Sequence, residues 1–139
     1  MIRLSRDIFN KILEHARGSY PHECCGVLVG SVAGGKRVLD ACPTDNLNRE
    51  RANDRYEIDP AQLLRIEKDT RAKGLDVLGF YHSHPDHPPR PSEFDRERGW
   101  PEYSYIIVSV RNGVDTVLKS WTFTEDDEPF GEEEVVVED

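Results

Sequence analysis

Cysteine is scarce in this sequence, and its scarcity excludes the disulfide-rich class of small secreted proteins. Only three cysteines occur among 139 residues, and two of them, Cys24 and Cys25, are adjacent. A disulfide framework needs an even, well-spaced set, so we expect reduced thiols. The N-terminus carries charges where a signal peptide needs an apolar core. Together these features predict a cytoplasmic protein.

Long apolar runs and an excess of basic residues are missing as well. No apolar run approaches the roughly 20 residues that a membrane-spanning helix needs, so we expect no membrane association. The chain has 27 acidic and 18 basic residues, and nine of the acids fall in the segment 125–139, which has no Lys or Arg. The other residues are therefore balanced in charge and predict no basic groove for nucleic acid.

The chain has the length of one domain, spanning residues 1–139, which can bury a single core. Apolar spacing predicts two amphipathic helices, one capped by Ser5 and ending at Gly18, the other capped by Asp59 and ending at Gly74. A short third helix is expected over 92–98. Strands are predicted over 24–30, 36–42, 77–81, 103–110 and 114–123, with shorter ones over 56–58 and 132–138. This pattern indicates an α+β fold with one mixed, curved sheet.

Two histidines follow the predicted strand 77–81. Because side chains alternate faces in an extended chain, His82 and His84 point the same way and lie close enough to bind one cation. Prolines at four of the next seven positions disfavour regular pairing beyond His84, so we expect the chain to leave the sheet there as an exposed loop. The alternative is a pair of surface histidines with no metal.

Asp95 is the candidate third ligand. It lies three positions after Ser92 at the start of the short helix, and the preceding loop is long enough to bring that helix end back to the histidines. Two histidines and one carboxylate leave a fourth position for water, as in catalytic zinc sites. The same spacing fits a capping box, in which the Asp95 lone pairs serve the helix N-terminus instead. On this interpretation the two roles exclude each other.

Several other polar residues have simpler expectations. The polar segment 43–55 is predicted to be a long loop that faces substrate. His87 is expected to be exposed, near substrate, and His15 to be an ordinary surface residue. Cys24 and Cys25 are expected to fill space in the core or near the site, with thiolate ligation by Cys24 as an alternative.

The order of these residues resembles the signature of the JAMM (Jab1/MPN/Mov34) metallopeptidases. His82-Ser83-His84-Pro85, six further residues, and Ser92-Glu93-Phe94-Asp95 fill every position of H-[ST]-H-P-x6-S-x-x-D. Glu23, ahead of a glycine-containing apolar run, matches a glutamate that the family carries in that context. The resemblance covers about residues 3–123. It implies an MPN architecture, similar to that of cytidine deaminases.

The resemblance also implies a reaction and the residues that perform it. It implies a zinc peptidase or isopeptidase with one Zn²⁺ per chain, held by His82, His84 and Asp95. Glu23 would be the general base, and Ser92 would lie beside the developing oxyanion.

The short chain is similar to the small stand-alone prokaryotic members, which are associated with ubiquitin-like sulfur carriers. The implied reaction is hydrolysis at the C-terminal tail of such a protein, releasing cysteine, a short peptide or a conjugated lysine. We expect a monomer or a weak homodimer. The alternatives are a small-peptide or cell-wall endopeptidase of the same fold and a non-catalytic MPN scaffold. A zinc deaminase would need H-x-E and P-C-x-x-C, and the sequence has neither.

Overall fold

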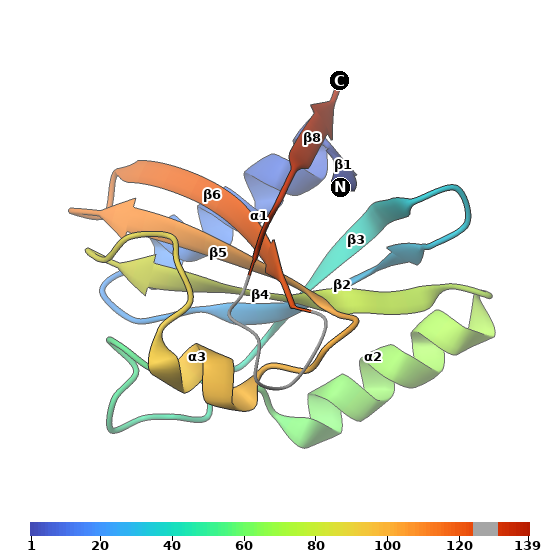
Figure 1. Ribbon diagram of the computed structural model, residues 1–139. Coiled ribbons are helices and arrows are strands. Elements are labelled where there is room, and N and C mark those ends of the chain that lie inside the picture. Colours follow the sequence, from blue (N-terminus) through green and yellow to red (C-terminus); the bar gives the residue numbers. More distant parts are fainter. Residues whose placement is uncertain (124–130) are drawn as a thin grey trace.

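A computed structural model describes residues 1–123 and 131–139 (Figure 1). Its described strands form one mixed sheet in the order β7-β6-β5-β4-β2-β3-β1-β8. The strands are β1 (Ile2–Ser5), β2 (Cys25–Ser31), β3 (Lys36–Thr44), β4 (Asp76–Pro85), β5 (Ser104–Arg111), β6 (Asp115–Thr122), β7 (Gly131–Glu133) and β8 (Val135–Glu138). The predicted α+β class is confirmed.

Three helices accompany the sheet in the described part of the chain: α1 (Arg6–Ser19), α2 (Pro60–Ala72) and α3 (Glu93–Arg98). Both predicted caps of the long helices are confirmed, since the side chains of Ser5 and Asp59 accept backbone N–H groups. The predicted stop at Gly18 is wrong by one residue, because α1 continues to Ser19 and Tyr20 caps it. In Figure 1, α1 lies behind the sheet, and α2 and α3 lie on its near side. None of these helices is long and apolar enough to cross a membrane.

The main hydrophobic core forms where α1 packs on the sheet. Ile12, Leu13 and Ala16 of α1 are buried against residues of β1, β2, β4 and β5. Tyr81 of β4 lies in this core, and a Cβ atom on Gly26 would come within 2.2 Å of its ring. A glycine at position 26 therefore lets the Tyr81 ring pack across β2.

Strand pairing brings distant parts of the sequence together at one end of β4. Cys25 of β2 lies opposite His82, and β4 pairs in parallel with β5 as far as Pro85 and Val110. The expectation that pairing ends at His84 is therefore wrong by one residue. Pro85 itself has no N–H, but the N–H of Asp86 donates to Val110 O at 2.8 Å, which keeps the chain beside β5.

The other predicted strands and turns are largely confirmed. Asn112 and Gly113 both have positive φ between β5 and β6, as a type I′ turn requires. The segment 56–58 is not a strand, because its pairing is limited to an isolated bridge between Asn46 and Ile58. The polar loop begins after β3 ends at Thr44, two residues later than expected.

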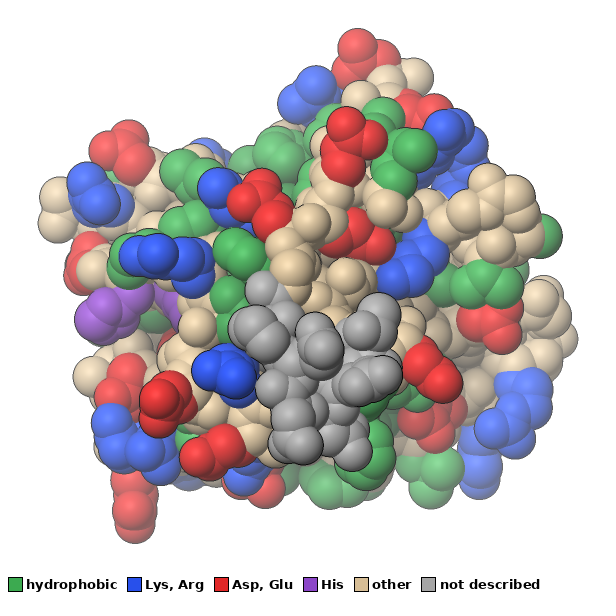
Figure 2. Space-filling view, viewed as in Figure 1, with side chains coloured by type: hydrophobic (Ala, Val, Ile, Leu, Met, Phe, Trp, Pro, Cys, Tyr) green, Lys and Arg blue, Asp and Glu red, His purple; other side chains and the backbone are tan. Residues whose placement is uncertain are grey.

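The C-terminal segment joins opposite edges of the sheet. The predicted edge strand over 132–138 is instead two short strands, β7 beside β6 and β8 beside β1, with only Glu134 between them. The sheet must therefore curve until its two edges meet, as the course of β8 toward β1 in Figure 1 shows. The start of the acidic segment 125–139 lies outside the described residues. Figure 2 shows acidic and basic side chains interspersed on one face, in agreement with a body of balanced charge.

Candidate metal and catalytic site

Three side-chain atoms converge at the carboxyl end of β4. His82 Nε2 and His84 Nε2 are 3.2 Å apart, and Asp95 Oδ2 lies 3.2 Å from the first and 3.1 Å from the second. Ligands of a tetrahedral zinc ion at 2.0–2.1 Å are separated by about 3.3 Å, so the triangle has nearly the edge length of a zinc coordination shell. All three side chains are buried. The three residues therefore fit a metal ion that retains an open fourth position.

Hydrogen bonding prepares His84 to be a ligand. Its Nδ1 lies 2.9 Å from the carbonyl oxygen of Pro88, which can only accept, so Nδ1 carries the proton. The Nε2 lone pair of the neutral ring then faces His82 and Asp95. A histidine ligand typically donates its other ring N–H to a carbonyl or carboxylate in this way. Burial lowers the pKa of His82, which also favours the neutral imidazole that a metal needs.

Asp95 serves the helix cap and the histidine cluster at once. Its Oδ2 accepts the Ser92 N–H at 2.9 Å, while the Asp95 N–H donates to Ser92 Oγ at 3.1 Å, which completes a capping box. The same Oδ2 faces both histidines. The cap and the contacts with both histidines thus coexist on one carboxylate, which has about four lone-pair sites when ionised. Burial alone would raise the Asp95 pKa, but His82, His84 and the Ser92 N–H together hold it well below its usual range.

Glu23 lies beside these residues at the entry to β2. Cys25 pairs with His82, so continuing the antiparallel register brings Glu23 opposite His84 and on the same face of the sheet. Glu23 is only 5% exposed, and its Oε1 has no hydrogen-bond partner among the described residues. Burial, followed by repulsion from Asp95 and Asp54, raises its pKa to about 9. A buried carboxyl with a free oxygen next to a metal-binding cluster is suited to moving protons.

A cleft of about 490 Å³ joins Glu23 to the rest of the site, and we call it the Glu23 cleft. Its walls are Glu23, Arg51, Asp54, His84, His87, Pro88, Arg90, Pro91, Ser92 and Phe94. The structure thus brings together the five candidate site residues, which are Glu23, His82, His84, Ser92 and Asp95. His87 is exposed at the cleft, as expected, and the loop 43–55 contributes Arg51 and Asp54.

The segment 86–91, here called the proline loop, is held in place by residues that no motif identified. Asp86 accepts hydrogen bonds from Tyr20 Oη at 2.6 Å and from the Asn112 N–H at 2.8 Å. The indole N–H of Trp121 donates to Pro89 O at 2.9 Å, next to the Pro88 carbonyl that holds His84. In the sequence, Trp121 is one aromatic residue in an ordinary strand. Only the fold shows its contact with the loop.

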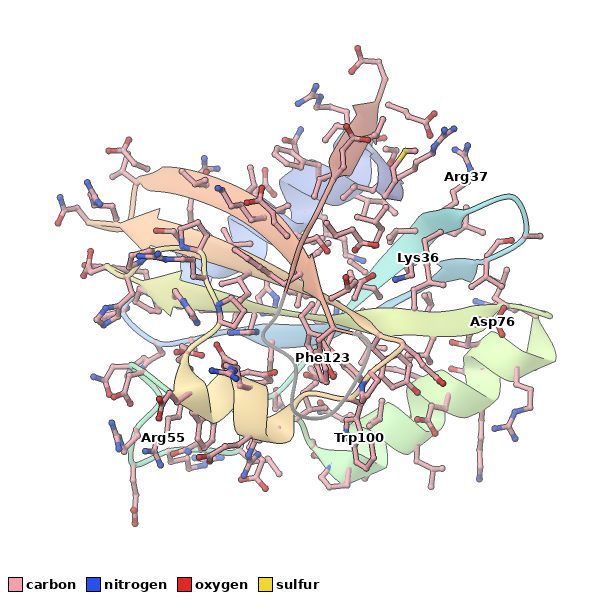
Figure 3. All side chains as sticks on the ribbon, in the orientation of Figure 1. Lys36, Arg37, Arg55, Asp76, Trp100 and Phe123 are labelled. Carbon is pink, nitrogen blue, oxygen red and sulfur yellow. The ribbon has the colours of Figure 1, made fainter. Side chains whose placement is uncertain are left out.

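Two residues of the loop between β3 and α2 also support the site. The Tyr56 ring stacks on His82 with ring centroids 4.3 Å apart. The Asn46 amide donates to the carbonyls of Glu23 and Arg55, and its oxygen accepts N–H groups of the same loop. Arg55 lies over the Phe94 ring at 4.6 Å, and Figure 3 places it beside α3. The sequence predicted that Asn46 and Arg55 lie in a substrate-facing loop and Tyr56 in a short strand, and it did not indicate these individual contacts.

The cysteines and His15 have no position in the cluster. Cys24 and Cys25 are buried, and burial raises their thiol pKa values to about 12 and about 11, which disfavours the thiolate form of a ligand. The expectation that His15 is ordinary surface is wrong. Its Nδ1 lies 2.8 Å from Tyr81 Oη on the core side of β4, because α1 packs directly over that strand.

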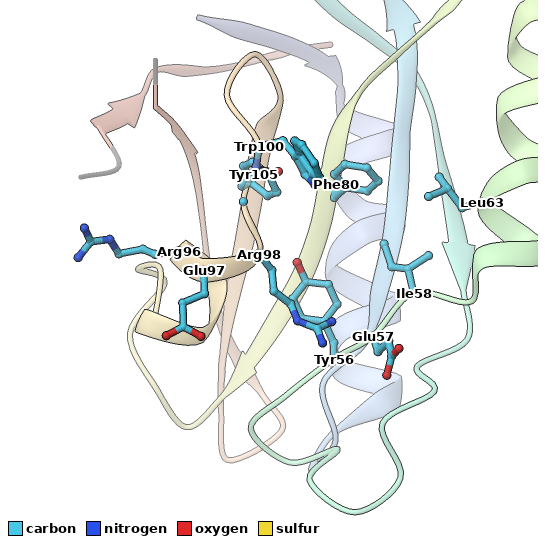
Figure 4. A pocket seen from close by; sticks show the side chains of 11 residues that line it. Tyr56, Glu57, Ile58, Leu63, Phe80, Arg96, Glu97, Arg98, Trp100 and Tyr105 are labelled. Atoms are coloured by element: carbon cyan, nitrogen blue, oxygen red, sulfur yellow. Dashed lines mark hydrogen bonds between the residues drawn. The ribbon is translucent and has the colours of Figure 1, made fainter. Parts of the chain in front are cut away.

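A second hollow, of about 660 Å³, lies between α2 and α3, and we call it the aromatic pocket. Tyr56, Phe80, Trp100 and Tyr105 contribute its rings, and Figure 4 shows the last three close together. Tyr56 both lines this pocket and stacks on His82, so it connects the pocket to the candidate metal site, and the pocket shares no lining residue with the Glu23 cleft.

Comparison with known proteins agrees with this geometry. The family model described as prokaryotic homologs of the JAB domain matches residues 5–124. A desampylase of Haloferax volcanii is 42% identical over 113 residues, covering 78% of this chain and 80% of that protein. The CysO-cysteine peptidase of Mycobacterium tuberculosis is 30% identical over 116 residues, covering 83% and 77%. A solution structure of a protein from Desulfitobacterium hafniense has a TM-score of 0.85 at 35% identity, covering 99% and 93%.

The match to the family model includes every residue of the cluster and of the Glu23 cleft. These two curated relatives are named a desampylase and a CysO-cysteine peptidase. The chain therefore belongs to the prokaryotic JAB family within the JAMM/MPN group, and it is a hydrolase whose His82, His84 and Asp95 could hold a metal ion.

Proposed function

We propose that this enzyme uses zinc to hydrolyse the bond at the C-terminal tail of a ubiquitin-like or sulfur-carrier protein. The observation that carries the proposal is the triangle of His82 Nε2, His84 Nε2 and Asp95 Oδ2, with edges of 3.1–3.2 Å, beside Glu23 and Ser92. The substrate class rests on the relatives, one named a desampylase and another a CysO-cysteine peptidase.

Zinc is the proposed metal because the ligand set matches catalytic zinc. His82, His84 and Asp95 are the proposed ligands, and they leave one position for water or substrate. When bound, zinc supplies Lewis acidity that brings the pKa of water down to about 7 and polarises a carbonyl. The Pro88 carbonyl and the Tyr56 ring fix the two imidazoles and limit the reorganisation that metal binding requires.

Glu23 is the proposed general base. Its carboxylate accepts a proton from the attacking water and hands it to the leaving amine, so one C–O bond forms and one C–N bond breaks for each water consumed. A nearby cation favours the charged carboxylate and lowers the Glu23 pKa from its metal-free value of about 9 toward neutral pH. The two forms of Glu23 needed in a turnover then become accessible at neutral pH.

Ser92 is the proposed donor to the oxyanion. Its Oγ accepts the Asp95 N–H at 3.1 Å, which orients the hydroxyl and leaves its own proton available for donation. Ser92 lines the Glu23 cleft, where the oxygen of the substrate carbonyl acquires negative charge.

The acyl part of the substrate is proposed to occupy the aromatic pocket. A carrier tail must approach the metal-binding residues from the side opposite its leaving group, and Tyr56 connects this pocket to His82. Aromatic walls with a few polar groups suit an extended peptide. Figure 3 places Trp100 between α3 and the start of α2, at this pocket.

The proposal is tested by incubating zinc-loaded protein with three substrates and following product masses. The substrates are a sulfur carrier ending in Gly-Gly-Cys, a carrier joined to a lysine side chain, and free peptides of the same tail sequence. We expect cleavage after Gly-Gly in the protein substrates, its loss with a chelator, and its return with zinc. Cleavage of the free peptides alone would indicate a general peptidase and contradict the proposal.

A further inference from the structure

We propose that Arg90 binds the free α-carboxylate of the leaving group. The enzyme would then prefer substrates that release an amino acid over substrates that release a lysine side chain of a protein. This inference rests on the proposed function and names the leaving-group class of the same site.

The Glu23 cleft is the leaving-group side of the site. Glu23 must reach the nitrogen of the leaving amine to protonate it, and Glu23 lies in the wall of this cleft with Ser92 and His84. The carrier tail is assigned to the aromatic pocket, whose lining residues all differ from those of the cleft. Whatever is attached to the scissile nitrogen therefore contacts the remaining walls of the cleft, which include Arg51, His87 and Arg90.

Arg90 is the cation of this cleft that is available to a ligand. Arg51 is already engaged, since both its Nε and its Nη2 donate to the carboxylate of Asp54. Within residues 1–123 and 131–139, the Arg90 guanidinium makes no hydrogen bond or ion pair. A guanidinium at the wall of a concave site, with its donors uncommitted, matches the two oxygens of a carboxylate.

The backbone of Arg90 is held in a fixed relation to a proposed metal ligand. The Arg90 N–H donates to Pro88 O at 2.8 Å, and that same oxygen accepts His84 Nδ1–H at 2.9 Å. Proline precedes and follows Arg90, and Trp121 holds the carbonyl of Pro89. The backbone that carries the guanidinium therefore needs little reordering when the side chain binds a ligand.

The position of this cation distinguishes two leaving groups. In a released amino acid, the carboxylate is separated from the scissile nitrogen only by the α-carbon, so it stays beside Glu23 and within the Glu23 cleft. In an isopeptide-linked lysine, the scissile nitrogen ends a long aliphatic chain and the α-carboxyl group is tied up in a peptide bond. Only the first leaving group brings a negative charge to Arg90.

The test compares three versions of one sulfur carrier with the zinc-loaded enzyme. One ends in Gly-Gly-Cys with a free carboxylate, the second ends in the same sequence as a carboxamide, and the third is joined to the side chain of Nα-acetyl-lysine amide. For the wild-type enzyme we expect kcat/KM to be about ten- to a hundredfold higher for the carboxylate than for the carboxamide, as a charge-assisted hydrogen bond provides.

Variants assign the preference to Arg90. In Arg90→Gln, kcat/KM for the carboxylate substrate should fall to within about threefold of the carboxamide value measured with the same variant. Arg90→Lys keeps the charge and should restore part of the preference. Arg65→Gln, on the exposed surface of α2, is the matched control and should change neither value. Zinc content and melting temperature of each variant check that the fold and the metal site are intact.

Each failure has a separate meaning. If wild type cleaves carboxylate and carboxamide equally, or if Arg90→Gln retains the full preference, the inference is wrong while the proposed function stands. If the zinc-loaded enzyme cleaves none of the three carriers, the proposed function is wrong and the inference falls with it.

Discussion

Glu23 is a buried carboxyl group whose surroundings oppose its charge in the metal-free chain. Its pKa is raised from 4.5 to about 9, so the folded protein holds a proton that the unfolded chain releases between these values. Stability from this group is complete below its unfolded pKa and is lost as the pH rises through its folded pKa. Burial thus keeps the Glu23 carboxyl protonated until a nearby cation lowers its pKa.

Without metal, the raised pKa of Glu23 should make the stability of the protein depend on pH. In the presence of a chelator, Glu23→Gln should be more stable than wild type at pH 8, with the difference shrinking toward pH 4. The relative stability should change by up to about 1.4 kcal/mol for each pH unit. Urea unfolding of both proteins at several pH values measures the difference. A constant difference across the pH range would show that Glu23 titrates normally.

Ser92 has two separable tasks, the cap of α3 and the contact with the oxyanion. Ser92→Ala should lower the free energy of unfolding by about 1 kcal/mol through loss of the cap. It should also lower kcat by about a hundredfold or more through loss of the oxyanion donor, with little change in KM. Ser92→Thr keeps the hydroxyl and should retain most of both. A Ser92→Ala enzyme that loses stability alone would limit Ser92 to the cap.

At the residue scale, the sequence identified the candidate ligands but not the residues that hold them in position. His82 and His84 follow from strand alternation, which is local. The positions of Tyr56 and Trp121 depend on packing between segments far apart in the chain, which no local pattern contains. Whether Asp95 can cap α3 and also face both histidines depends on the directions of its lone pairs, which residue spacing does not contain.

Among the elements, the proline loop connects the strand that holds two proposed ligands to the helix that holds the third. Trp121 and the backbone of Arg90 support its middle, and Asp86 fastens its start to the turn between β5 and β6. The sequence predicted that the prolines make an exposed loop. It did not predict that the Pro88 carbonyl fixes the tautomer of His84, because that contact depends on the path of the loop.

Trp121→Phe should weaken metal binding without removing a ligand. Loss of the indole donor leaves Pro89 O unheld and loosens the neighbouring contact of Pro88 with His84, so zinc affinity should fall about ten- to a hundredfold. Competition with a chromophoric chelator measures the affinity. Trp100→Phe replaces the other tryptophan, which is 67% exposed and outside this loop, and should leave the affinity unchanged. Equal affinities for both variants would contradict the proposed support.

In the whole molecule, a buried ionic group lies where the two edges of the sheet meet. Glu133 is 9% exposed and accepts Ser120 Oγ–H at 2.8 Å, with Lys36 Nζ at 3.3 Å and the N-terminal amine at 3.6 Å. Lys36 Nζ also donates to Ser104 Oγ at 2.6 Å. Burial alone would raise the Glu133 pKa, but these hydrogen bonds and positive charges lower it overall. The Glu133 carboxylate thus links the C-terminal segment to the N-terminal amine and to Lys36.

Glu133→Gln should destabilise the folded protein by about 1–3 kcal/mol at pH 7, because Lys36 loses its charged partner. Since the folded pKa of Glu133 is lowered, its contribution is present above pH 4.5 and lost as the pH falls below it. The variant should therefore lose less stability than wild type on acidification. Glu132→Gln, at an exposed pair with Lys119, is the control and should change stability by less than about 0.5 kcal/mol. Thermal melts at pH 7 and pH 4 compare the three proteins.

The central claim is that His82, His84 and Asp95 hold a zinc ion, and that turnover requires both this ion and Glu23 as the general base. Zinc per chain, measured by elemental mass spectrometry on purified wild type, Asp95→Ala and Glu23→Gln, tests it most directly when turnover is followed on the same samples. We expect one zinc per chain in wild type and in Glu23→Gln, and less than about a tenth in Asp95→Ala, with turnover reduced about a hundredfold or more in both variants. Full zinc occupancy in Asp95→Ala would reduce Asp95 to a helix cap and contradict the account.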